Sequence, residues 1–342
     1  LMKGLDVIAQ AQSGTGKTGA FSIGSLNNVD EDLKETQVIV LSPTRELADQ
    51  TFKVITELSS YTKVTSCKVI GGTRVHDGIQ DLRKIPHVIV GTPGRILDML
   101  QKKHIFTEHI KTLIIDEADE MLSQGFQEMI HSVFNFIPKT TQVGLFSATF
   151  PQELLELSQQ FMNNPEKILV NKESLTLEGI SQFYINVKNH TWKYDVLTDI
   201  YNTINIAQCI IYINSKNRLQ EIYQALNQDN FPVGMIHGSL MTSEREQIMN
   251  QFRQGEIRIL LSTDLLSRGI DIQQLSLVIN YDLPIQKETY IHRIGRSGRY
   301  GRKGVAINFV TDRDLPDLEE LQTFYNTKID VMPQNIAEII SV

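Results

Sequence analysis

The sequence has few of the residues that define secreted, metal-stapled or membrane proteins. Only two of its 342 residues are cysteines, Cys67 and Cys209, and they lie far apart. Two isolated thiols make neither a disulfide framework nor a cysteine-based zinc site, so we expect a reducing compartment. No apolar run approaches the roughly 20 residues that a bilayer span needs, and no signal-peptide core follows Leu1. We expect a cytoplasmic protein, with the nucleus as the alternative, and no membrane partner.

Positive charge is also scarce. The chain has 33 Lys and Arg against 40 Asp and Glu, a net charge of −7, and both of its halves are acidic. Proteins that bind nucleic acid constitutively usually present a basic face or domain. The composition therefore argues against constitutive binding, and any nucleic-acid contact is expected to be local and conditional.

The pattern along the chain predicts an α/β fold. Short runs rich in Val and Ile alternate with amphipathic stretches, which is typical of parallel sheets flanked by helices. Residues 46–58 and 243–252 have clear helical spacing, the second with Ser243 as its expected N-cap. The expected strands are residues 38–41, 87–90, 112–115, 143–146, 209–213, 258–261, 277–280 and 305–309. The pattern occurs twice, so we expect similar domains over residues 1–170 and 181–342, joined by a polar linker at 171–180.

A phosphate-binding loop follows the first apolar run, residues 7–9, and precedes helix-like residues 19–26. Glycines let backbone N–H groups approach phosphate oxygens, Lys17 would reach the β- and γ-phosphates, and Thr18 would supply a hydroxyl to Mg²⁺. A plain glycine turn with a solvated lysine is the alternative, and the flanking strand and helix disfavour it. The predicted loop consists of Ala11, Gln12, Ser13, Gly14, Thr15, Gly16, Lys17 and Thr18.

A carboxylate cluster follows another expected strand. Asp116, Glu117 and Asp119 come directly after residues 112–115. In parallel sheets, ligands bind at the carboxyl ends of the strands, where a second acidic strand end can hold the metal of a phosphate loop. We predict that Asp116 binds Mg²⁺ and that Glu117 polarises the attacking water. A solvated acidic turn is the alternative, and the presence of the phosphate loop disfavours it.

Together these motifs resemble those of the DEAD-box RNA helicases of superfamily 2. Further stretches fit that family in order along nearly the whole chain. They are residues 43–47 (PTREL), 71–72 (GG), 92–95 (TPGR), 147–149 (SAT), 262–264 (STD), 268–271 (RGID) and 292–299 (HRIGRSGR).

The resemblance implies two tandem RecA-like domains that use ATP and Mg²⁺. It assigns Arg296 and Arg299 as arginine fingers on the γ-phosphate, for which a solvated basic segment is the alternative. It also assigns Asp271 to the ATP ribose. It implies coupling between ATP and RNA through Asp119, Ser147 and Thr149, for which ordinary hydroxyl bonding to the loop is the alternative. It also places the adenine-reading Q motif upstream of the phosphate loop, so we expect that motif to precede Leu1. The expected RNA contacts are Pro43, Thr44, Arg45, Gly71, Gly72, Thr92, Gly94, Arg95, Asn214 and Thr263.

Within the family, residues 264–284 and 301–310 are similar to the translation-initiation branch, whereas Ser297 and Tyr300 resemble the nuclear exon-junction branch. The resemblance thus implies an RNA-stimulated ATPase and helicase that unwinds short RNA duplexes in translation initiation. Its partners would be single-stranded or short-duplex RNA without sequence preference, and scaffold or initiation-factor proteins. Two alternatives stay open: an ATP-gated RNA clamp of the exon-junction or pre-rRNA-processing type, and a DNA-translocating ATPase of the same superfamily.

Overall fold

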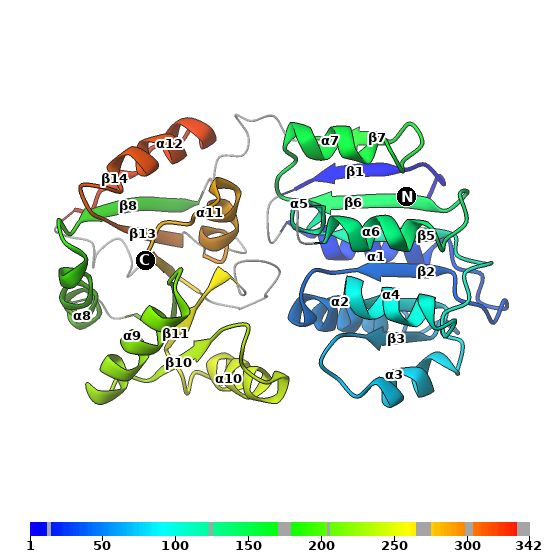
Figure 1. Ribbon diagram of the computed structural model, residues 1–342, viewed down its shortest axis with the longest axis horizontal. Helices are drawn as coiled ribbons and strands as arrows, with labels where there is room; N and C mark the ends of the chain where they lie inside the picture. The colour runs from blue at the N-terminus through cyan, green and yellow to red at the C-terminus, as the bar shows by residue number, and fades with distance from the viewer. Residues whose placement is uncertain are drawn as a thin grey trace. The chain divides into compact units, whose positions relative to one another are not determined.

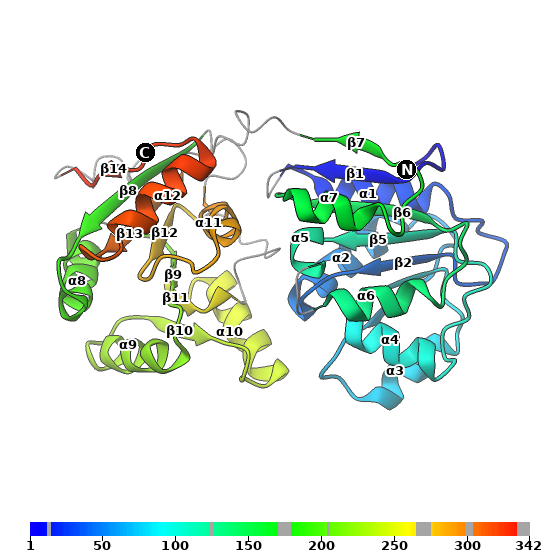
Figure 2. The same ribbon diagram turned by 45° about the horizontal axis from the view of Figure 1, so that its top comes forward.

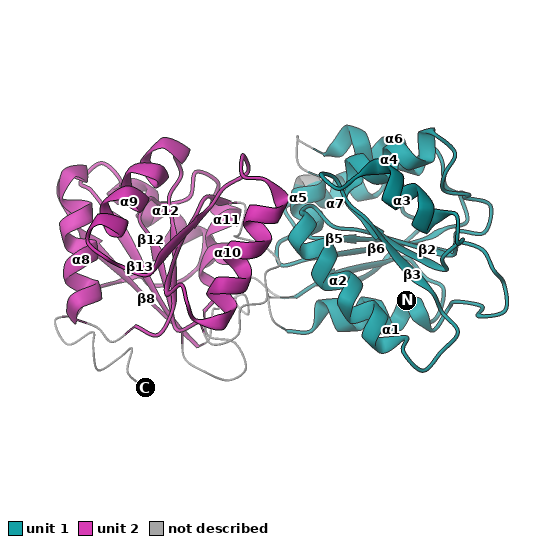
Figure 3. Cartoon of the chain, turned by 90° about the horizontal axis from the view of Figure 1, so that it is seen from below, with its two compact units in different colours: residues 1–170 teal, residues 171–342 magenta. Residues whose placement is uncertain are grey.

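The computed structural model describes residues 1–11, 15–122, 126–169, 179–203, 206–264, 275–297 and 304–333. The chain divides into two compact units, residues 1–170 and 171–342, coloured teal and magenta in Figure 3. Among the helices of the described ranges, none is long and apolar enough to cross a membrane.

Unit 1 is built on a seven-stranded sheet whose described strands are all parallel and lie in the order β3-β4-β2-β5-β6-β1-β7 (Figure 1). The strands are β1 (Val7–Gln10), β2 (Val38–Leu41), β3 (Ser66–Val69), β4 (Val88–Gly91), β5 (Thr112–Asp116), β6 (Gln142–Ser147) and β7 (Glu166–Ile168). The helices are α1 (Lys17–Leu26), α2 (Arg45–Leu58), α3 (Val75–Leu82), α4 (Pro93–Gln101), α5 (Ala118–Met121), α6 (Gln127–Phe134) and α7 (Gln152–Ser158).

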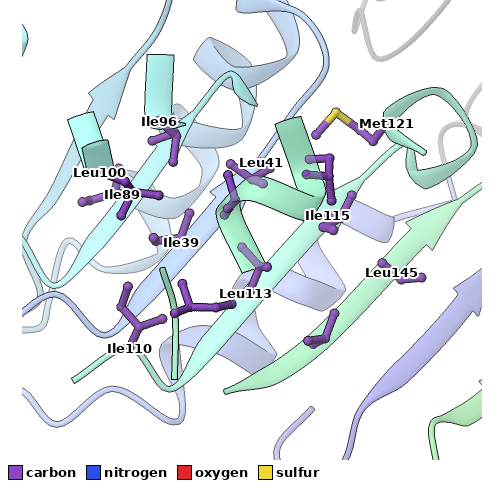
Figure 4. Packing of buried hydrophobic residues seen from close by; sticks show 14 of the residues in the cluster. Ile39, Leu41, Ile89, Ile96, Leu100, Ile110, Leu113, Ile115, Met121 and Leu145 are labelled. Atoms are coloured by element: carbon purple, nitrogen blue, oxygen red, sulfur yellow. The ribbon is translucent and has the colours of Figure 1, made fainter. Parts of the chain in front are cut away.

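Alternate residues of the central strands pack on opposite faces of this sheet. Val38 and Val40 of β2 join a cluster with side chains of α1 and α2, whereas Ile39 and Leu41 join the cluster that includes α4 and α6 (Figure 4). Figure 3 shows α1 and α2 on one side of the sheet and α4 and α6 on the other. Each fully buried Ile, Leu or Val contributes about 1.5–3 kcal/mol relative to exposure, which explains the uninterrupted apolar runs.

Unit 2 repeats the same topology. Its described strands are parallel and lie in the order β10-β11-β9-β12-β13-β8-β14 (Figure 2), which matches unit 1 strand for strand. The strands are β8 (Ile180–Asn186), β9 (Cys209–Tyr212), β10 (Val233–Ile236), β11 (Ile259–Ser262), β12 (Leu277–Asn280), β13 (Gly304–Val310) and β14 (Asp330–Val331). The helices are η2 (His190–Trp192, 3₁₀), α8 (Lys193–Thr203), α9 (Lys216–Gln228), α10 (Thr242–Gln254), α11 (Lys287–Ile294) and α12 (Leu315–Tyr325).

The predicted fold class is confirmed: the chain contains two parallel sheets flanked by helices. The predicted cap of α10 is wrong. The helix begins at Thr242 with Met241 as its N-cap, because the Glu244 carboxylate accepts the Met241 backbone N–H at 2.8 Å. Ser243 therefore lies inside the first turn. Of the expected linker, residues 171–178 lie outside the described ranges, and Ile180 already belongs to β8.

Candidate nucleotide and nucleic-acid site

The described part of the phosphate loop joins β1 to α1 in unit 1. Ala11 N donates to Ser147 O at 3.0 Å, which ties the loop to the end of β6. Gly16 caps α1 with a φ of 97°, a left-handed conformation that favours glycine. Lys17 begins α1 and donates from Nζ to Ala11 O at 2.9 Å, so its ammonium lies over the loop. Thr15 and Thr18 lie on either side of Gly16 and Lys17, whereas Gln12, Ser13 and Gly14 fall outside the described residues.

The carboxylates lie at the end of β5, two strands from β1 in the sheet. Asp116 is the last residue of that strand and is buried, and its Oδ1 accepts the Glu117 N–H at 3.0 Å. Burial and the charge of Glu117 raise the pKa of Asp116 to about 7, although Lys17 lowers it. A buried carboxylate beside other carboxylates is stabilised by a cation, and carboxylate and hydroxyl oxygens are the ligands that Mg²⁺ prefers. The donor set of Asp116 and Thr18 therefore fits this metal.

Glu117 has a left-handed backbone, with φ 49° and ψ 55°, at the N-cap of the short helix α5. Such a conformation in a residue other than glycine costs on the order of 1–3 kcal/mol and clusters at functional sites. The chain therefore leaves the extended conformation of β5 at Glu117, directly after Asp116.

Hydrogen bonds join all three residues that are predicted to couple ATP to RNA. Thr149 Oγ1 donates to Asp119 Oδ2 at 2.5 Å, and the Thr149 N–H donates to Ser147 Oγ at 3.4 Å. These bonds link the end of β6 to α5. The loop after β6 is thus in direct contact with the acidic segment that follows β5.

The residues predicted to bind RNA in unit 1 gather at the ends of β2, β3 and β4. Thr92 Oγ1 accepts the Gly71 N–H at 3.1 Å, and Arg95 donates to Thr73 O at 3.1 Å. The Arg45 guanidinium lies against Gly72, whose φ is 79°; a Cβ there would approach Arg45 Cζ to 2.3 Å. These contacts bring a glycine pair, two arginines and a hydroxyl into one surface.

The hydroxyls of this surface also have structural roles that the sequence alone did not reveal. The Thr44 hydroxyl caps α2 by accepting the Leu47 N–H at 3.2 Å. Thr92 occupies the N-cap position of α4, but its hydroxyl accepts the Gly71 N–H and no helix N–H. Each hydroxyl that accepts a bond still carries a proton to donate. Pro43 precedes Thr44 after β2, and Gly94 lies in the first turn of α4, where a Cβ would meet Met129 Sδ at 3.6 Å.

In unit 2 two of the described candidates follow strands and one follows a helix. Asn214 lies after β9 and Thr263 after β11, and the Arg296 Nε donates to His292 O at 3.1 Å beyond α11. The Asn214 side chain donates to Leu283 O at 2.8 Å and accepts from Arg293 at 2.7 Å. Both its amide nitrogen and its amide oxygen therefore make hydrogen bonds within unit 2. Asp271 and Arg299 lie outside the described residues.

Sequence reasoning gave no role to Arg293, which is fully buried. Its Nε donates to Asp264 Oδ1 at 2.6 Å, and its two terminal nitrogens donate to Asn280, the Asp282 carbonyl and Asn214. The guanidinium carbon lies 5.1 Å from the Tyr212 ring centroid. The available signal was its place in the basic motif at residues 292–299, but the sequence did not distinguish this buried arginine from Arg296 and Arg299.

The arrangement in unit 1 defines a nucleoside triphosphatase of the helicase type, and family comparison agrees. Residues 1–157 match the family described as DEAD/DEAH box helicase, and residues 192–301 match the helicase conserved C-terminal domain. The chain belongs to the DEAD-box helicase family, as its motifs predicted.

Among its relatives are proteins named ATP-dependent RNA helicase eIF4A. The protein of Meyerozyma guilliermondii is 53% identical over 341 residues and that of Candida albicans is 52% identical, each match covering 100% of this chain and 86% of the relative. The structure of Saccharomyces cerevisiae Dbp5 bound to RNA and ADP BeF3 is 37% identical, with a TM-score of 0.92 and coverage of 98% of this chain and 88% of Dbp5. Mss116p bound to single-stranded RNA and AMP-PNP is 26% identical, with a TM-score of 0.85 and coverage of 98% and 72%.

Proposed function

We propose that this chain is an ATP-dependent RNA helicase of the initiation factor 4A type, which unwinds short RNA duplexes in the cytoplasm. The observation that carries the proposal is the identity of 52–53% to eIF4A proteins along the full chain. A likeness of this extent covers both units and every motif. The phosphate loop and the Asp116 cluster supply the chemistry that the activity requires.

In the proposed reaction, the phosphate loop and Lys17 bind the triphosphate of ATP, and Asp271 binds its ribose. Asp116 and Thr18 would hold Mg²⁺, which when bound neutralises charge on the phosphates. Glu117, whose backbone is left-handed, orients and polarises the attacking water. Arg296 and Arg299 stabilise charge on the transferred phosphoryl group, a role worth roughly 10³–10⁵ in rate.

RNA is proposed to bind at the ends of β2, β3 and β4 of unit 1 and at Asn214 and Thr263 of unit 2. Backbone N–H groups, hydroxyls and a few arginines contact sugar and phosphate, which fix register but do not read sequence. Asp119, Ser147 and Thr149 are proposed to connect this surface to the carboxylates. The bond between Thr149 and Asp119 supports that connection. We infer that scaffold or initiation-factor proteins direct the enzyme to its RNA targets.

The RNA-clamp alternative depends on Ser297 and Tyr300. Ser297 Oγ donates to Ile294 O at 2.9 Å, so its hydroxyl serves the end of α11, and Tyr300 lies outside the described residues. The similarity to eIF4A extends over the whole chain, whereas the clamp reading depends on two positions. We therefore favour the helicase.

The test is steady-state ATP hydrolysis with single-stranded RNA, with DNA of the same sequence and without nucleic acid. We expect RNA to raise kcat and DNA not to. Glu117→Gln should retain binding of ATP and RNA while losing at least about 100-fold in kcat, because proton transfer and water positioning contribute on that order. A wild-type rate that RNA does not change would contradict the proposed function, and normal turnover by Glu117→Gln would contradict the role of that residue.

A further inference from the structure

The two units place a lysine and an aspartate at equivalent points of one topology. In unit 1, Lys17 begins α1, the first helix after β1, and Asp116 ends β5. In unit 2, Lys193 begins α8, the first α-helix after β8, and Asp282 follows β12, the counterpart of β5. All four residues therefore belong to the carboxyl ends of their parallel sheets, where ligands of such sheets bind.

The lysine of unit 2 is buried and bonds to residues of its own unit. Lys193 is 1% exposed, and its Nζ donates to Asp282 Oδ1 at 3.1 Å and to Tyr281 O at 2.5 Å. The ammonium also lies 5.3 Å from the Tyr281 ring centroid. By contrast, the Lys17 ammonium bonds only a loop carbonyl among described residues, so its charge remains available to a phosphate.

The surroundings of Lys193 also disfavour a phosphate. Residues 187–192, which join β8 to Lys193, contain no glycine, whereas the unit 1 loop needs glycines to aim backbone N–H groups at phosphate oxygens. A cavity of about 400 Å³ lies beside the pair. Four carboxylates line it, those of Asp282, Asp314, Asp317 and Glu320. Its three cations, Lys193, Arg218 and Lys287, are each paired with Asp282 or Glu320.

Asp282 connects this lysine to the loops that carry the proposed RNA and ATP residues. Its Oδ1 also accepts from Arg218 at 3.0 Å, and its Oδ2 accepts the Asn214 N–H at 3.1 Å. The Asp282 carbonyl accepts from Arg293 at 2.7 Å, and Arg293 in turn donates to Asn214 and Asp264. A continuous path of hydrogen bonds thus runs from Lys193 through Asp282 to Arg293, three residues before Arg296.

We propose that Lys193 is a positioning residue for ATP hydrolysis, in a phosphate site that unit 2 has closed with its own ion pair. Where Lys17 is proposed to bind substrate, Lys193 binds Asp282 and so fixes the Asn214 loop and, through Arg293, the turn that carries Arg296. This inference rests on the proposed function. Under this inference, Lys193 affects the rate of ATP hydrolysis although it contacts neither ATP nor RNA.

The test is Lys193→Met, which keeps the length of the side chain and removes its charge. In the intact protein we expect RNA-stimulated kcat to fall roughly 10- to 100-fold, because small displacements of catalytic groups have effects of that size. Binding of a fluorescent ATP analogue without RNA should change less than about twofold, because Lys17 and Asp116 belong to unit 1. Lys287→Met is the matched control: it lines the same cavity but pairs with the exposed Glu320, and it should keep the wild-type kcat.

An unchanged kcat in Lys193→Met would overturn the inference, as would a parallel loss of kcat and of analogue binding, which indicates a general structural defect. If Lys193→Met does not fold, Arg218→Met replaces it, since that side chain is 42% exposed and contacts the same carboxylate. Arg218→Met should lower kcat severalfold with analogue binding retained, and a wild-type kcat there would overturn the proposal. The proposed function itself fails only if the wild-type protein shows no RNA-stimulated hydrolysis.

Discussion

At the residue scale, left-handed backbone conformations occur at three described residues of the proposed ATP and RNA surfaces. Gly72, Glu117 and Gly16 all have left-handed backbones, and all lie in or beside the proposed ATP and RNA surfaces. Of these three residues, only Glu117 has a side chain that makes the conformation costly.

Gly72→Ala should weaken RNA binding. The new Cβ would approach the Arg45 guanidinium to 2.3 Å, and the positive φ disfavours alanine, so Arg45 must move. We expect RNA affinity, measured by fluorescence anisotropy with a non-hydrolysable ATP analogue, to fall about tenfold. Stability should decrease by about 1 kcal/mol.

Gly78→Ala is the matched control for this substitution. Gly78 lies inside α3, and nothing lies within 4 Å of its added Cβ. Replacing a helical glycine with alanine stabilises by up to about 1 kcal/mol. RNA affinity should remain unchanged in this variant; equal losses from Gly72→Ala and Gly78→Ala would contradict the role of the Arg45 contact.

The two cysteines should resist alkylation in the folded protein. Burial raises the pKa of the Cys67 thiol and of the Cys209 thiol to about 12 each. Because the thiolate is the nucleophile, both should react at pH 8 roughly 1,000-fold more slowly than a free thiol of ordinary pKa, about 8.5. The rate should rise with pH up to the raised pKa, provided that the fold persists. Mass spectrometry after iodoacetamide treatment measures this, with the urea-unfolded protein as control, and rapid labelling of the folded protein would contradict it.

At the scale of elements, the central strands were predictable and the edges were not. The runs at β2, β5 and β12 are apolar on both faces because helices cover both sides. The short edge strand β7 is exposed, and β14 has two exposed residues, so neither gives a hydrophobic signal. Strand β8 lies inside the sheet but mixes polar and apolar residues, and the sequence analysis did not predict it.

The candidate site was predictable to a similar degree. The residues predicted to contact RNA follow β2, β3 and β4, and parallel strands bring their carboxyl ends to one edge. Gly71 donates to Thr92 and Arg95 donates to Thr73, which joins the ends of β3 and β4. The pairing of Lys193 with Asp282 was not predictable. The two residues lie 89 positions apart, and only the sheet order makes them neighbours.

The cap of α10 provides a test at this scale. Glu244→Ala removes the acceptor of the Met241 N–H and should lower the free energy of unfolding by about 1 kcal/mol. Ser243→Ala and Glu246→Ala change exposed residues of the same helix and should have effects within about 0.5 kcal/mol. Urea denaturation of the three variants gives the comparison. A loss in Ser243→Ala as large as that in Glu244→Ala would restore serine as the cap.

At the scale of the whole molecule, the two units have separate cores and one topology. Under the proposed function they divide the chemistry between them: unit 1 carries the phosphate loop and carboxylates, and unit 2 carries the arginines. Completion of an active site by residues of a second domain is a recognised way to make turnover depend on a second ligand. Because ATP and RNA would then favour the same state, each should increase the affinity of the other.

The corresponding prediction concerns a fragment of residues 1–170. It contains Lys17, Asp116 and Glu117 but neither arginine finger, and should hydrolyse ATP at least about 1,000-fold more slowly than the intact chain with RNA. Circular dichroism of the fragment verifies that it is folded. A folded fragment as active as the intact protein would contradict the division of the chemistry.

The presence of both units on one polypeptide has a kinetic consequence. Groups on a shared chain meet at an effective concentration that the tether sets, commonly millimolar for a short connection, however dilute the solution. Specific activity per molecule should therefore stay constant on dilution to nanomolar protein at saturating RNA and ATP. A split version assembled from two separate chains would lose its activity under the same dilution.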